Sequence, residues 1–283
     1  TKGIVGTLVK HFFGKATTAQ NGVTGQYRHF MYPVTDTFAA ANLDTKALTL
    51  NWNISEGATT KNHAFRGGRV KSLSFAQETG NNLIMTAELM GQIKTASGTA
   101  IASPVFAAEN LRCDYNNVTV YTGTITRTGT APDYTAFTFG SATTIKPDKV
   151  SVKVENGMED ALRLSGLDYP DKTRMGKYKV TLEMTIDFED PASGFSSADD
   201  FNTWLAGVAT TNFFLHWDTG TQAGTGDNHI LDIDLPVMQR MGGAPEFSLD
   251  KDPLITLKYE GLYDSTTTKY ILAVLLKNTA TAI

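Results

Sequence analysis

The chain contains 283 residues, with 25 Lys plus Arg against 29 Asp plus Glu, which gives a formal net charge of −4. Hydrophobic residues make up 41% and charged residues only 19%, a balance that excludes intrinsic disorder. Forty threonines and 25 glycines favour pleated strands, so a helical bundle is excluded as well. The single Cys113 excludes an internal disulfide and a zinc site of the CxxC…CxxC kind.

Charge is distributed unevenly along the chain. Residues 1–141 carry 12 basic and 8 acidic side chains, a net of +4, whereas residues 142–283 carry 13 and 21, a net of −8. Ordinary surface variation explains such a split, and head-to-tail association of copies of the chain is the alternative. Neither half contains the cluster of Lys and Arg that a stable nucleic-acid-binding surface needs.

The first predicted element is a short amphipathic helix or docking arm over residues 3–13, ended by Gly14. The polar residues 15–26 are predicted to form a loop, so that residues 1–45 make up an N-terminal helix or arm and loop. The start lacks the long apolar run and cleavage site of a secretory signal, and no stretch reaches the ~18 apolar residues of a membrane helix. We therefore expect assembly in a cytoplasm and no membrane insertion.

Strands are predicted from residue 47 onward. Apolar and polar residues alternate over 47–54, and RVKSLSFA and NLIMTAELM flank a turn around Gly80, which predicts a hairpin over residues 69–90. Residues 91–104 are small and polar and predict a long mobile connection, and residues 92–146 are a candidate variable or extended loop region. Further strands are predicted at 118–126, 134–139 and 149–155.

The segment KYKVTLEMTIDF, residues 177–188, has the clearest pattern. Its apolar residues occupy one face without interruption, and its polar residues occupy the other. Such a strand separates a core from water, and no other predicted strand is as long with one wet face. The residues of interest on this face are Thr181, Glu183, Thr185 and Asp187.

A second helix is predicted at about 198–209, capped by Ser196 or Ser197, with an apolar stripe that includes Phe201 and Trp204. Strands follow at 212–217, 229–237, 253–260 and 269–277. The last is apolar on both faces, so it is either central in the sheet or covered by another subunit. About ten strands and two helices without βαβ alternation predict a single domain over 1–283, a mainly β, antiparallel sandwich or barrel.

No catalytic signature is present, which predicts a protein that is not an enzyme and has no cofactor or metal. His216 and His229 flank a hairpin-like segment and are a candidate metal or acid/base pair, with strand-end residues beside a turn as the favoured reading. Carboxylates after this segment offer oxygen ligands for Ca²⁺, but their alternation favours the polar face of a solvated strand. This second set consists of Asp227, Asn228, Asp232 and Asp234.

The order of these segments resembles a phage tail tube protein, the major tail protein of long-tailed phages. The resemblance runs from about residue 6 to 276, through GTLVKHFFG, YRHFMYPVT, ALTLNWNISEG and HAFRGGRVKSLSFAQETGNNLIMTAELMGQ. It continues through VSVKVENGMEDALRLSGLDYPDKTRMGKYKVTLEMTIDFED, the helix with Phe201 and Trp204, and HILDIDLPV. The resemblance rests on the order and spacing of many features, each of which is weak by itself.

The resemblance implies a tail-tube-like subunit of the virion tail, assembled in the host cytoplasm. Copies would join in rings, usually of six, and stack into a hollow tube that first encloses a tape-measure protein, meets tail-end proteins, and later lets DNA pass without specific binding. Thr181, Glu183, Thr185 and Asp187 are then candidate lumen-facing residues, with bulk solvent or a neighbouring sheet as the equal alternative.

A different class of function remains open from the sequence. A surface-displayed β-sandwich adhesin or carbohydrate-binding module would carry exposed aromatic side chains in a shallow groove. Its candidate residues are Tyr121, Tyr134 and Tyr263.

Overall fold

The computed structural model describes residues 4–22, 25–33, 47–56, 59–91, 93–98, 112–161, 172–174, 176–207, 209–248, 251–281 and 283. The helices in these ranges are α1 (Ile4–Phe13), α2 (Ser197–Ala206) and a 3₁₀ turn, Tyr115–Asn117. The strands are β1 (Ala16–Gln20), β2 (Tyr27–Met31), β3 (Leu48–Glu56), β4 (Thr59–Glu78), β5 (Ile84–Met90), β6 (Ile93–Gly98), β7 (Val118–Thr130), β8 (Asp133–Ile145), β9 (Lys149–Glu155), β10 (Glu159–Ala161), β11 (Lys172–Arg174), β12 (Lys179–Asp187), β13 (Thr210–Gln222), β14 (Asn228–Gly242), β15 (Pro245–Ser248), β16 (Lys251–Gly261) and β17 (Ala273–Asn278).

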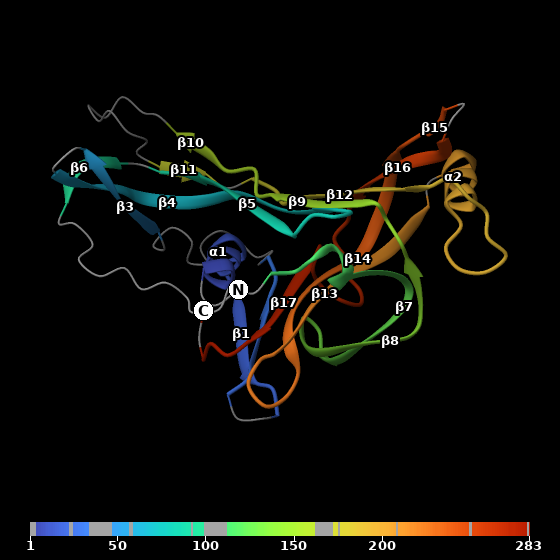
Figure 1. Cartoon of the computed structure of the whole chain (residues 1–283), viewed down its shortest axis with the longest axis horizontal. Helices are drawn as coiled ribbons and strands as arrows, with labels where there is room; N and C mark the ends of the chain where they lie inside the picture. Colours follow the sequence, from blue (N-terminus) through green and yellow to red (C-terminus); the bar gives the residue numbers. More distant parts are fainter. Residues whose placement is uncertain are drawn as a thin grey trace.

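One large antiparallel sheet bends over itself to make two layers (Figure 1). Its central path runs β1-β2-β17-β14-β16-β12-β9-β4-β3. Strand β14 belongs to both layers, because its first half pairs with β17 and its second half pairs with β16. The predicted fold class, an antiparallel β-sandwich or barrel with short helices, is confirmed.

The main core lies between the layers, and it follows from period-two alternation. In β12, Val180, Leu182 and Met184 are fully buried while the residues between them face outward. Helix α1 packs beside β4 and β2. Its Val9, Phe12 and Phe13 are buried, and the Tyr178 hydroxyl donates to the Phe12 carbonyl over 2.8 Å.

A second, smaller core lies on the other side of β14 and β17, under the β7–β8 hairpin. The first half of β7 pairs with β13, and the register shifts between Thr124 and Thr126. Gly123 has φ 91°, a conformation that side chains disfavour, and the Asn212 side chain hydrogen-bonds its N–H and its carbonyl. The hairpin can therefore bend over the sheet, where it encloses an aromatic cluster containing Phe30, Tyr32, Tyr134 and Tyr270.

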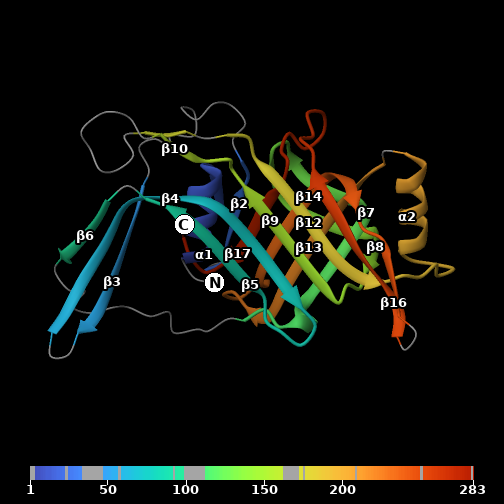
Figure 2. The ribbon, with the colours of Figure 1, turned by 90° about the horizontal axis from the view of Figure 1, so that it is seen from above.

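The two ends of the long axis carry different elements. Strands β3 and β6 and the first part of β4 extend at one end, and α2 lies at the other, in both views (Figures 1 and 2). Strand β15 lies near α2 in Figure 1. Gly91 sits where the extension meets the body, and an added Cβ would come within 1.9 Å of the Phe65 ring. The strand therefore needs glycine at this close approach.

Most predicted elements are present, with some differences. Both helices are confirmed, and the predicted strand at 177–188 is the shorter β12, Lys179–Asp187. The expectation that no other strand with one wet face is as long is wrong, because β16 has 11 residues against the 9 of β12. The loop predicted at 15–26 is wrong for Ala16–Gln20, which form an edge strand on β2. The mobile connection predicted at 91–104 contains β6, Ile93–Gly98, and its last part lies outside the described residues. The apolar last strand, β17, is central, which is one of the two alternatives considered for it, because it lies between β14 and β2.

Candidate functional surface

The outward side of β12 is the surface that the sequence singled out. Glu183 and Asp187 are exposed there, and Thr181 and Thr185 are half-buried between neighbouring strands. The alternation places all four on the side opposite the buried core, so the prediction that they share one face is confirmed. Whether that face lines a tube remains a prediction.

Strands β9 and β16 flank β12 and extend this surface, which we call the wet face. Register pairs Thr181 with Lys153 and Glu260, and Glu183 with Ser151 and Lys258. The wet face comprises Lys149, Ser151, Lys153 and Glu155 on β9, Lys179, Thr181, Glu183, Thr185 and Asp187 on β12, and Leu254, Thr256, Lys258 and Glu260 on β16.

The charges of the wet face balance, with four lysines against four carboxylates. Lys258 lies 3.7 Å from Glu183, Lys179 lies 3.7 Å from Glu260, and Lys153 lies 2.6 Å from Glu155. The hydrogen bond to Glu155 raises the pKa of Lys153. These lysines are not among the residues predicted from the sequence, although the alternation in KVSVKVE and LITLKYE places them on the polar sides of their strands.

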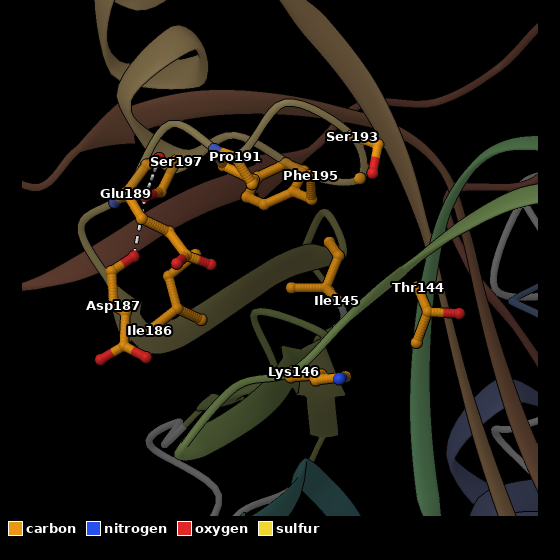
Figure 3. A pocket seen from close by; sticks show the side chains of 11 residues that line it. Thr144, Ile145, Lys146, Ile186, Asp187, Glu189, Pro191, Ser193, Phe195 and Ser197 are labelled. Atoms are coloured by element: carbon orange, nitrogen blue, oxygen red, sulfur yellow. Dashed lines mark hydrogen bonds between the residues drawn. The ribbon is translucent and has the colours of Figure 1, made fainter.

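A cavity of about 340 Å³ opens at the Asp187 end of the wet face. Figure 3 shows Pro191 and Phe195 across it from Ile186 and Lys146. Its wall is fixed by Ser197, whose hydroxyl donates to the Asp187 carbonyl (2.8 Å) and accepts from the Glu189 N–H (2.9 Å). That buried hydroxyl is fully engaged with backbone groups, so it holds this wall of the cavity in place.

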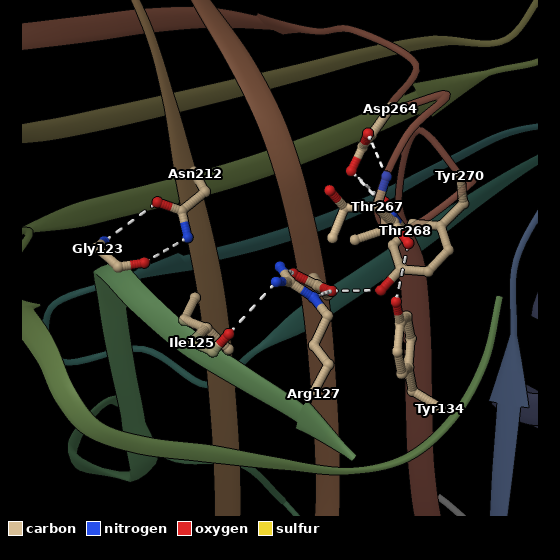
Figure 4. Close-up of polar contacts among 10 residues, drawn as sticks. Gly123, Ile125, Arg127, Tyr134, Asn212, Asp264, Thr267, Thr268 and Tyr270 are labelled. Carbon is tan, nitrogen blue, oxygen red and sulfur yellow. Dashed lines mark hydrogen bonds and ion pairs between the residues drawn. The ribbon is translucent and has the colours of Figure 1, made fainter. Parts of the chain in front are cut away.

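The carboxylates considered for Ca²⁺ do not converge on one point. Asp234 is 1% exposed under the β7–β8 hairpin. Arg127 approaches both of its oxygens at 2.7 Å, and the Tyr270 hydroxyl donates to it over 2.5 Å. Figure 4 labels these two partners. Asp227 bonds Lys277 at 2.6 Å and Asn21 at 2.9 Å, and the hydrogen bond from Lys277 lowers its pKa. The expectation that Asp232 and Asp234 lie on a solvated strand face is therefore wrong, because the hairpin and its second core cover that face.

The two histidines considered for a metal site have different surroundings. His216 lies opposite Asp232 in the β13–β14 ladder, and its Nδ1 is 2.6 Å from the carboxylate. His229 is buried and lies three residues before Asp232 in β14. Because side chains alternate along a strand, His229 points to the opposite face of β14 from Asp232, the same face as Leu231. Within the described parts of the chain, no group of three His, Cys, Asp or Glu residues is arranged to hold a metal ion.

The tyrosines considered for glycan binding do not form one exposed platform. Tyr134 is 7% exposed, and its hydroxyl donates to the Thr267 carbonyl over 3.1 Å (Figure 4). Tyr121 is half-buried and stacked on Phe139 with ring centroids 4.4 Å apart. Tyr263 alone of the three is exposed, at 45%. The prediction that Tyr134 is available at the surface is wrong.

These features describe a β-structural subunit with a broad, charge-balanced outer face. A family model for the phage tail tube protein matches residues 1–261, and the chain belongs to that family. It is accordingly a structural component of a virion tail that assembles into an oligomeric tube. Among curated proteins, none matches the chain. No helix in the described ranges has both the length and the apolar character needed to cross a membrane.

Proposed function

We propose that the chain assembles into stacked rings, six subunits in each, and that the wet face lines the lumen of the resulting tube. Thr181, Glu183, Thr185 and Asp187 are then exposed to what passes through, first a tape-measure protein and later the genome. The tube meets tail-end proteins at its ends, and it assembles in the host cytoplasm. In this role the chain is not an enzyme and needs no cofactor or metal.

The balanced charge of the wet face is the observation that supports this proposal. A surface with clustered Lys and Arg would displace counterions from DNA and hold it, whereas four lysines interleaved with four carboxylates present little net charge. The ion pairs also leave few lysines free to contact phosphate. A sliding polymer therefore meets a polar surface without a strong attachment point.

A labelling experiment on assembled tubes tests the lumen assignment. The native Cys113 is buried, and its burial raises the pKa of the thiol to about 11, so it reacts slowly with maleimides. A thiol introduced by Glu183→Cys should react with a small maleimide before and after assembly, but with a bulky polymer-linked maleimide only before assembly. Glu159→Cys, at another exposed carboxylate, is the matched control for reagent quality and fold.

Two outcomes would contradict the lumen assignment. Equal reaction of Glu183→Cys with the bulky reagent in assembled tubes would place the wet face outside. Protection from both reagents would place it at a contact between subunits. A charge test on whole particles is complementary: Asp187→Lys should leave assembly intact and slow DNA delivery, because the added positive charge attracts phosphate. Unchanged delivery would count against the assignment.

A further inference from the structure

The end of the molecule that carries α2 presents apolar side chains that the chain itself does not cover. Leu205 is 63% exposed and Phe247 is 74% exposed. The ring centroid of Phe188 lies 6.2 Å from that of Phe247 and 6.1 Å from that of Phe201. The ring centroids of Phe201 and Trp204 are 5.9 Å apart. Leu205 lies on α2 one helical turn after Phe201, on the same side of the helix. We call these five residues the α2 surface. Contiguous exposed apolar patches of this kind mark interaction sites.

The α2 surface is held rigidly from below. Arg240 is buried, lies 5.4 Å from the Phe201 ring centre and 5.3 Å from that of Trp204, and bonds Asp200 of α2. The Tyr259 hydroxyl also donates to Asp200, over 2.8 Å. A preformed surface loses little side-chain freedom when a partner binds.

Exposed carboxylates surround the α2 surface. None of them forms a salt bridge within the described part of the chain. They are Glu189, Asp190, Asp199, Glu246 and Asp252. A partner that covers the patch is therefore expected to bring positive charge to its rim.

The opposite end of the same molecule carries that positive charge. Strands β3 and β6 and residues 59–70 of β4 contain four basic residues and one acidic residue. These are Lys61, Arg66, Arg69 and Lys94, against Glu56. Arg66 is exposed. The two ends lie at opposite extremes of the long axis in both views (Figures 1 and 2).

Each end also has a strand edge without a neighbour among the described residues. At the α2 end β15 pairs with β16 only, and at the other end β3 and β6 each pair with β4 only. Such edges need a cover, because unpaired backbone groups promote association. Complementary charge and free edges at both ends identify a second copy of this chain as the partner.

We infer that the α2 surface of one copy docks against the β3–β4–β6 end of the next. The contact joins two different surfaces, so it is heterologous, and repetition produces a ring or an open filament. This inference rests on the proposed self-assembly and assigns the surfaces that carry it. It also gives a role to the charge difference between the basic first half and the acidic second half of the sequence, because the two halves supply opposite charges to the contact between copies.

Two blocked variants test this docking. Leu205→Asp with Phe247→Asp disables the α2 surface, and Arg66→Glu, which reverses the exposed charge on β4, disables the basic end. Each alone should need at least about tenfold more protein to assemble, the effect of losing a modest part of an interface. Mixed together they should form a 1:1 dimer and nothing longer, because only one intact surface of each kind remains. Sedimentation velocity measures both results.

Controls separate docking from misfolding and from the proposed function. Tyr263→Asp changes another exposed aromatic residue and should assemble like the unmodified chain; circular dichroism confirms the fold of every variant. The docking would be overturned if the α2 variant assembled at the same protein concentration as the unmodified chain. It would also be overturned if the mixture of the two variants stayed monomeric, even where the unmodified chain forms hollow tubes. If the unmodified chain forms no tubes but the mixture still dimerises, the docking stands and the proposed tube role fails.

Discussion

Strands β12 and β14 carry the same alternating sequence pattern, but their polar residues have opposite environments. In KVTLEMTID the residues between the apolar ones face outward on the wet face. In HILDIDLPV the acidic residues Asp232 and Asp234 are 5% and 1% exposed, because the β7–β8 hairpin covers that side. Alternation shows that the two sides of a strand differ, but it does not show that the polar side meets water.

The partners of the charges differ in the same way. On β12, Glu183 is exposed and has one lysine at 3.7 Å. On β14, Asp234 has both oxygens bound by Arg127 and a further bond from Tyr270. An exposed ion pair contributes about 0–1 kcal/mol, whereas removing one member of a buried pair leaves an uncompensated charge.

The largest effect is therefore expected at Arg127. Arg127→Met should lower the free energy of unfolding by about 3–5 kcal/mol, because Asp234 stays buried without its cation. Urea unfolding of the unassembled protein measures the change. Lys258→Met, which removes the cation of an exposed pair, is the matched control and should stay within about 0.5 kcal/mol. Equal losses in the two variants would contradict the distinction between the two strands.

A smaller, pH-dependent effect is expected at His216. Burial lowers its pKa, but the hydrogen bond and the negative charge of Asp232 outweigh burial, so the pKa is raised in the folded protein. The folded state then binds this proton more tightly than the unfolded chain. The stabilisation is complete below the ordinary histidine pKa of ~6.5, and it is lost as pH rises through the higher folded-state value.

Unfolding free energies on both sides of neutral pH measure this dependence. The loss between pH 6 and pH 8.5 should be smaller in His216→Gln, which has no titrating ring, than in the unmodified chain. Asp218 and Lys277 also act on His216, in opposite directions, so Asp232→Asn isolates the main partner. A profile that is identical in His216→Gln would show that other groups produce it.

The sequence predicted what depends on neighbours along the chain and missed what depends on distant segments. Ser196 accepts the Asp199 N–H over 2.9 Å, and this cap was readable from the local sequence. Burial of Asp234 was not, because Arg127 lies 107 residues earlier and reaches it only after β7 bends at Gly123. The exposure of Leu205 on α2 could not be predicted for a related reason. An apolar stripe on a helix predicts a covered face, but it does not say whether this chain or another copy covers it.

The smallest effect on stability is expected on the wet face. Reversing one ion pair with Glu183→Lys and Lys258→Glu keeps the charge balance and the distance between opposite charges, so the free energy of unfolding should change by less than about 0.5 kcal/mol. Urea unfolding in 1 M salt, where the screening length is about 3 Å, should remove even that difference. A loss above 2 kcal/mol would mean that the pair stabilises the fold, as the pair of Arg127 and Asp234 does.

Exposed ion pairs contribute little to folding, so the interleaving of four lysines with four carboxylates needs another explanation. A near-neutral surface over which a polyanion slides supplies one.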